Sequence, residues 1–109
     1  MMNNSEELIK RITDFLDGLD ISAETKRFGG AEYFMKNGKV ICSVFGSNLL
    51  VKCKPEALEE ILKNEHTSTV PGADGNPQSD MFYLKPEGIE NDGVLKNWLM
   101  YGVEYTSIK

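Results

Sequence analysis

The sequence predicts an α+β domain of two layers, in which helices cover one face of an antiparallel sheet of about five strands. Three observations support this fold class. Apolar residues recur at helical spacing near both ends of the chain, apolar and polar residues alternate between residues 27 and 54, and the hairpin signal Asn37-Gly38 divides that alternating region. The expected order is α-β-β-β-α-β-β-α. A length of 109 residues fits a single domain, residues 1–109.

The first expected element is an amphipathic helix over residues 4–19, because apolar side chains recur there every three or four residues. Asn4 or Ser5 can cap its start. The apolar stripe consists of Leu8, Ile12, Phe15, Leu16 and Leu19. We expect this stripe to pack against the sheet.

Three antiparallel strands follow, separated by the turns Asn37-Gly38 and Gly46-Ser47. Two-residue turns fix the register, which gives the pairs Met35–Val40, Tyr33–Cys42, Val44–Leu49 and Cys42–Val51. One face of the sheet then carries no charge, and we expect it to form the core. Its residues are Ala31, Tyr33, Met35, Val40, Cys42, Val44, Leu49, Val51 and Cys53.

The remaining elements follow from shorter signals. Pro55 begins a second helix that runs to about residue 64, with Leu58, Ile61 and Leu62 buried. Residues 67–80 are rich in Gly, Pro and small polar residues, which predicts a long mobile turn that opens with a short strand over 67–70. Residues 81–85 form a further strand, and a closing helix starts at Asn91 or Asp92.

The second face of the predicted sheet is the candidate for function. In the expected register Phe34 opposes Ile41, with Phe45 and Leu50 nearby. Glu32 is the only acidic residue on this face. The surrounding bases are Lys36, Lys39, Lys52 and Lys54. Such a face can be merely solvated, can contact a protein partner or a second copy, or can hold nucleic acid. Arg11 and Arg27 are the only arginines, which argues against base readout.

Composition excludes several classes of function. The net charge of -5 disfavours a whole-surface attraction to nucleic acid or membrane. Two cysteines and one histidine are too few for a structural zinc site, and no hydroxyl nucleophile has an identifiable base. We therefore predict no metal, no cofactor and no catalysis. No apolar run approaches the ~20 residues of a membrane span and no export signal is present, so we expect a cytoplasmic protein with free thiols.

An ordered series of short motifs carries a family resemblance that covers about residues 5–105. The series comprises Lys26-Arg27-Phe28-Gly29-Gly30, Tyr33-Phe34, Asn37-Gly38, Leu49-Leu50-Val51-Lys52, Pro55 and Met81 to Pro86. In this order and spacing it resembles the N-terminal domain of the TfoX/Sxy family. The resemblance implies helices over one side of an antiparallel sheet.

The founding members of that family regulate natural competence together with the cyclic-AMP receptor protein, and they join this domain to a helical C-terminal domain. Here Arg27 stands where the family usually has Met, and 109 residues leave no room for the second domain. Both departures weaken the transfer of the competence role, and membership of the family supports a fold more than a function.

Two hypotheses of function follow from the residues and the resemblance. The first is a non-enzymatic regulatory or protein-interaction module that binds through Phe34, Ile41, Phe45 and Leu50. The alternative is a small-molecule-binding or enzymatic domain that uses a cleft near Phe28, Gly29 and Gly30 and the 67–80 segment.

Overall fold

The computed structural model describes residues 4–46 and 48–107 of the chain, and side chains from Glu6 onward. Ser47 of the expected second turn, and the expected capping side chains of Asn4 and Ser5, lie outside what is described. The elements are α1 (Asn4–Gly18), β1 (Glu24–Phe28), β2 (Ala31–Lys36), β3 (Lys39–Phe45), β4 (Asn48–Lys52), α2 (Pro55–Ile61), β5 (Thr67–Pro71), β6 (Pro77–Leu84), the 3-10 turn η1 (Pro86–Ile89) and α3 (Asp92–Thr106).

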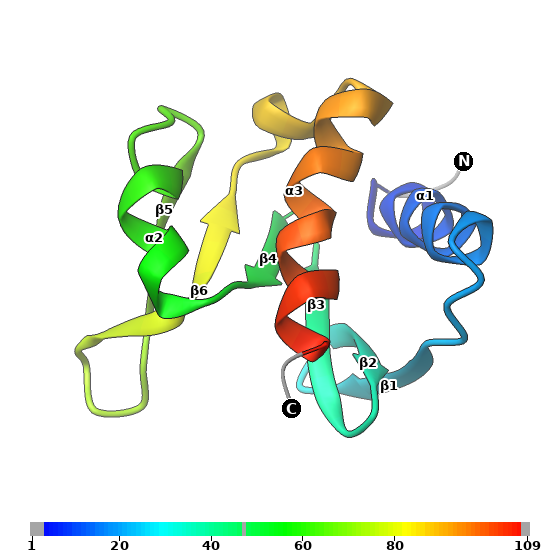
Figure 1. Ribbon diagram of the computed structural model, residues 1–109, viewed down its shortest axis with the longest axis horizontal. Coiled ribbons are helices and arrows are strands. Elements are labelled where there is room, and N and C mark those ends of the chain that lie inside the picture. Colours follow the sequence, from blue (N-terminus) through cyan, green and yellow to red (C-terminus); the bar gives the residue numbers. More distant parts are fainter. Residues whose placement is uncertain (1–3, 47, 108–109) are drawn as a thin grey trace.

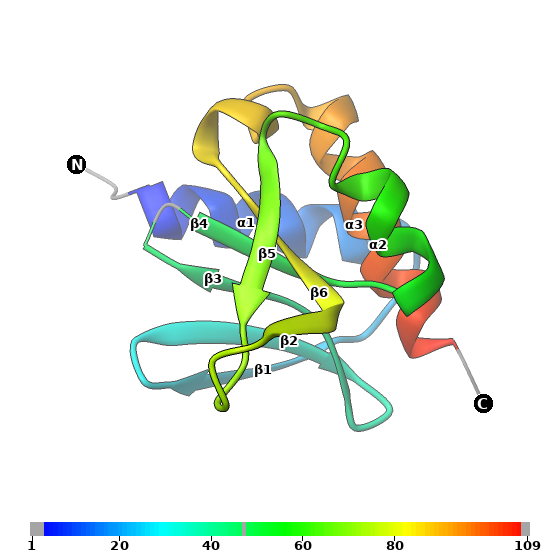
Figure 2. The same cartoon turned by 90° about the vertical axis from the view of Figure 1, so that its left-hand side faces the viewer.

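The α+β class and the antiparallel sheet are confirmed. Six strands form one sheet in the order β1-β2-β3-β4-β6-β5, and its twist carries β5 across the direction of β1 and β2 (Figure 2). The strand beyond the expected five is β1, in which every residue is exposed. Its sequence ETKRF has no alternating apolar residues, so periodicity gives no signal for it. No helix among the described residues is long and apolar enough to span a membrane.

The core lies on one face of this sheet, which we call the covered face. Phe34, Cys42, Val51 and Phe82 follow one another across β2, β3, β4 and β6 on that face. All three helices add buried side chains to the same cluster: Leu8, Ile12 and Leu16 from α1, Ile61 from α2, and Leu95 and Leu99 from α3. The helices are thus arranged along one side of the sheet (Figure 1).

The adjacent residues on these strands point to the other side of the sheet, because side chains alternate along a strand. We call this side the open face. It carries Tyr33, Ser43, Leu50 and Tyr83 in one row across β2, β3, β4 and β6. Tyr33, Leu50 and Tyr83 are half-buried and do not belong to the core cluster.

The expected register is confirmed at three pairs and wrong at one. Met35–Val40, Val44–Leu49 and Cys42–Val51 pair as predicted. Tyr33, however, pairs with Ser43 instead of Cys42, because Ile41 is an extra residue in β3 that forms a bulge. A one-residue shift moves side chains to the opposite face. Phe34 therefore lies on the covered face opposite Cys42, and Tyr33 lies on the open face.

Two segment predictions also need correction. Residues 67–80 are mostly strand, since β5 and β6 form a hairpin with only residues 72–76 between them. Small polar residues suit an edge strand such as β5, and Asp74 shapes the turn by accepting a hydrogen bond from the Asn76 backbone N–H at 3.0 Å. The second helix ends at Ile61, three residues earlier than expected. Asn91 caps α3 as predicted, its side chain accepting from the Val94 N–H at 3.1 Å.

Candidate interaction surface

The four apolar residues expected to share an exposed face are separated by the fold. Phe34 is 1% exposed and Ile41 0% exposed, so both belong to the core. The β3 bulge is the physical reason, because it turns both side chains away from the open face. Leu50 is half-buried on the open face, and Phe45 is 52% exposed. The expected cluster of four therefore does not form a surface, and only Phe45 and Leu50 remain available to a partner.

The four lysines expected around that cluster are also dispersed. Lys36 and Lys39 face each other across the Asn37-Gly38 turn. Lys54 precedes α2 at its N-cap position. Lys52 is engaged elsewhere: its Nζ lies 3.2 Å from Asp80 Oδ2 and 5.5 Å from the centre of the Tyr105 ring. These positions give no basic patch around the aromatic residues, which weakens the nucleic-acid interpretation.

A row of amphipathic side chains crosses the open face instead. It runs over all six strands in the order Lys26, Tyr33, Ser43, Leu50, Tyr83 and Ser68. The Tyr83 hydroxyl donates to Asn48 Oδ1 at 2.6 Å, which fixes the Tyr83 ring in place. Apart from Lys26 the row carries no charge. Ser43 is buried, so the half-buried Tyr33 and Tyr83 are the residues of this row that offer ring faces to a partner.

One end of the open face carries the most exposed aromatic residues, Phe28 and Phe45, which we name the aromatic corner together with Gly29 and Gly30. Phe28 is 77% exposed. The pairs Phe28–Ala31 and Ala31–Phe45 place both rings in one row, with the small Ala31 between them. The sequence pattern contained Phe28 and Phe45, but it did not show that the unrecognised strand β1 places them together.

Local backbone geometry explains the two glycines of the corner. Gly29 has φ of 61° and Gly30 φ of 84°, and a two-residue hairpin turn with both φ values positive favours glycine. A Cβ atom at Gly30 would lie 3.4 Å from Cε2 of Phe45, so the Phe45 ring lies against this glycine. The pair Gly29-Gly30 thus both makes the turn and supports the aromatic corner.

Both cysteine thiols have raised pKa values, as expected for side chains in the core. Burial raises the pKa of Cys42. Burial, followed by the nearby Asp80 carboxylate, raises the pKa of Cys53 to about 11. A nucleophilic or metal-binding cysteine needs the thiolate and hence a lowered pKa. Among the described residues no three His, Cys, Asp or Glu side chains form a group that could hold a metal ion.

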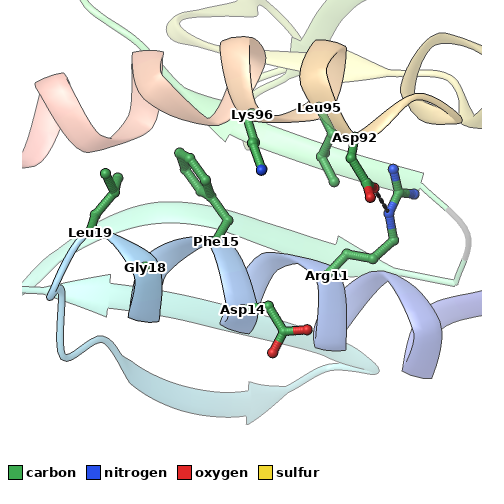
Figure 3. Close-up of a pocket in the computed structure, with 8 residues that line it drawn as sticks. All are labelled: Arg11, Asp14, Phe15, Gly18, Leu19, Asp92, Leu95 and Lys96. Carbon is green, nitrogen blue, oxygen red and sulfur yellow. Dashed lines mark hydrogen bonds and ion pairs between the residues drawn. The ribbon is translucent and has the colours of Figure 1, made fainter.

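A groove that the sequence did not indicate lies between α1 and α3, with a volume of about 430 Å³ (Figure 3). Arg11 Nε of α1 donates to Asp92 Oδ1 of α3 at 2.8 Å, across 81 positions of sequence. No local motif can signal a groove whose two walls are this far apart in the chain. The groove lies against α1 and α3, so it does not correspond to the cleft expected beside Phe28, Gly29 and Gly30.

Comparisons of the chain with protein-family models, with curated proteins and with solved structures gave no match. The resemblance to the TfoX/Sxy N-terminal domain therefore stays a prediction from the motifs quoted above.

Proposed function

We propose that this chain is a non-enzymatic, cytoplasmic interaction module of the TfoX N-terminal type, in which the aromatic corner contacts a second copy of the same chain. The observation that carries the proposal is the exposure of two phenylalanines in one row, 77% for Phe28 and 52% for Phe45. Exposed aromatic side chains that lie together favour a contact over solvation, because burial removes their apolar area from water.

The absence of charge in the corner favours a second copy as the partner. Each chain carries a net charge of -5, so two copies repel each other over most of their surfaces. A two-fold contact brings the same residues together from both copies. Phe28, Gly29, Gly30 and Phe45 carry no charge, so at this place self-contact puts no like charges directly opposite each other.

The corner is also held in shape before any contact forms. The Gly29-Gly30 turn joins β1 to β2, and the Phe45 ring rests on Gly30. A preorganised surface loses less conformational entropy on association, which strengthens binding. The regulatory character of the module rests on the family resemblance. The two free thiols support a reducing compartment, and their raised pKa supports a role without a nucleophilic cysteine.

Size-exclusion chromatography with light scattering, at low and at high salt, tests the proposal. We expect the wild type to elute as a dimer of the 12.2 kDa chain and the variant Phe28→Lys/Phe45→Lys as a monomer with unchanged far-UV circular dichroism. The matched control Val94→Lys/Met100→Lys changes two exposed apolar residues of α3 and should remain a dimer.

A wild type that stays monomeric at every concentration would overturn the self-association. So would a corner variant that remains a dimer. Loss of the dimer in the α3 control alone would move the contact to α3 and equally contradict the proposal.

A further inference from the structure

The groove between α1 and α3 is a second feature of the surface, separate from the aromatic corner. It is lined by Arg11, Asp14, Phe15, Gly18, Leu19, Asp92, Leu95 and Lys96. Its volume of about 430 Å³ lies within the range of small-molecule sites, ~300–1,000 Å³. A second groove, on the other side of Arg11 and Asp92, also has these two residues in its wall. The Arg11–Asp92 ion pair therefore closes one end of the first groove.

The other end of the groove is apolar and open. Phe15 lies in the last turn of α1, Leu19 directly follows the helix, and Leu95 of α3 is part of the buried core. Leu19 is 44% exposed, although its side chain is apolar. A Cβ atom at Gly18 would meet no atom within 4 Å, which shows that the space next to this glycine is free. The apolar end can thus receive a hydrocarbon chain or a ring.

Four charged side chains line the groove, and three of them have partners. Arg11 donates to Asp92 Oδ1 at 2.8 Å and, through its NH2 group, to the carbonyl oxygen of Ile89 at 2.7 Å. Asp14 lies 2.9 Å from Lys10 Nζ. The side chain of Lys96 forms no hydrogen bond or ion pair within residues 4–46 and 48–107. Its ammonium group points into the space between the two helices, in the groove that Phe15 also lines (Figure 3).

We propose that this groove binds a small organic monoanion with an apolar tail. The carboxylate of the ligand pairs with Lys96, and its hydrocarbon part lies on Phe15, Leu19 and Leu95. One unpaired ammonium group beside an apolar surface is complementary to one negative charge with an apolar body. A ligand with two negative charges fits less well, because its second charge would lie near Asp14 and Asp92, whose carboxylates also line the groove.

Octanoate is the probe for this site, titrated into ¹⁵N-labelled protein and followed by amide chemical shifts. We expect saturable shifts confined to residues 11–19, at the end of α1, and residues 92–99 of α3. The uncharged 1-octanol and the dianionic octyl phosphate should each bind about fivefold more weakly, because an exposed charge-assisted contact contributes only modestly.

Three variants separate the ligand site from a general effect of charge. Lys96→Gln should weaken octanoate binding about fivefold, whereas Lys63→Gln, an equal loss of charge at an exposed lysine paired with Glu60, should leave it unchanged. Gly18→Leu fills the open space beside the glycine and should abolish saturable binding.

Shifts that are scattered over the whole protein or do not saturate would overturn the proposal. Equal affinity for octanoate and 1-octanol would overturn the role of Lys96, as would a Lys96→Gln variant that binds like the wild type. Because the aromatic corner is not involved, octanoate binding should be the same in Phe28→Lys/Phe45→Lys.

Discussion

The two faces of the sheet use adjacent residues of the same strands for different purposes. On the covered face Phe34, Cys42, Val51 and Phe82 are at most 1% exposed, and three helices pack over them. One residue along, the open face carries side chains that are half-buried and tipped with hydroxyl groups, such as Tyr33 and Tyr83. Stability is therefore concentrated on the covered face, which leaves the open face free to change and to bind.

Phe34 and Phe45 offer the sharpest test of this difference. Both are phenylalanines, but Phe34 lies on the covered face and Phe45 on the open face. Phe34→Ala should lower the free energy of unfolding by about 3–5 kcal/mol, as expected for removing a buried ring and leaving a cavity. Phe45→Ala should lower it by less than about 1 kcal/mol, since half of the ring already contacts water. Urea denaturation of both variants measures the difference. Similar losses for the two variants would contradict the bulged register.

A second prediction concerns the contact of α3 with the covered face at Gly102. A Cβ atom there would clash with the backbone oxygen of Ile41, so α3 must move away from β3 to accept any side chain. Gly102→Ala should therefore lower the free energy of unfolding by about 1–3 kcal/mol, the usual cost of overpacking.

Gly18→Ala is the matched control for Gly102→Ala, since a Cβ at Gly18 meets nothing within 4 Å. It should be neutral or stabilise by up to about 1 kcal/mol, because alanine favours a helix over glycine. Thermal unfolding of the two variants measures the difference in stability between them. A Gly102→Ala variant as stable as the wild type would mean that α3 and β3 are not held this closely.

The bulge in β3 also shows how much of the strand register could be predicted from the sequence. Alternation and the Asn37-Gly38 turn predicted the strands and the Met35–Val40 pair correctly, because a two-residue turn fixes the register next to it. The extra residue Ile41 leaves no signal in an apolar run that reads VICSV, yet it exchanges Phe34 and Tyr33 between the faces. The prediction that Phe34 and Ile41 lie on an exposed face was wrong for that reason, and not because the fold class was misjudged.

Strand β1 and the groove between α1 and α3 show a second limit of prediction from the sequence. The ETKRF segment is an edge strand whose pairing to β2 depends on backbone hydrogen bonds, and its charged side chains resemble those of a loop. Phe28 could be assigned to the aromatic corner only once β1 was known to pair beside Ala31. The groove likewise depends on how α1 and α3 are placed by the sheet, which local spacing does not determine.

The third prediction tests whether the open face depends on its glycine turn. Gly30→Ala forces an L-residue into φ of 84° and places a methyl group in contact with the Phe45 ring, so it should cost about 1–2 kcal/mol of unfolding free energy. Gly29→Asn should cost less, because Asn tolerates φ near 61° and a Cβ there has open space. Light scattering should in addition show a weaker dimer for Gly30→Ala alone. Equal effects of both variants would argue against support of Phe45 by Gly30.

The last predicted effect on stability comes from the thiols of the covered face and appears only at high pH. Because folding raises the pKa of Cys53 from its ordinary 9.0 to about 11, the folded state keeps a proton that the unfolded state releases. The free energy of unfolding should therefore fall as pH rises from 9.0 towards about 11, and the fall should be smaller in Cys53→Ala.

Thiol reactivity measures the same pKa directly. At about pH 8 the raised pKa leaves roughly a hundredfold less thiolate at Cys53 than in the unfolded chain, so Ellman's reagent should react slowly with both native cysteines and rapidly with both in urea. A cysteine introduced on the open face by Phe45→Cys should react rapidly without urea, because this position is 52% exposed. If Cys42 or Cys53 reacted as fast as the introduced thiol, the helices would not shield the covered face, and the contrast between the two faces would fail at its simplest chemical test.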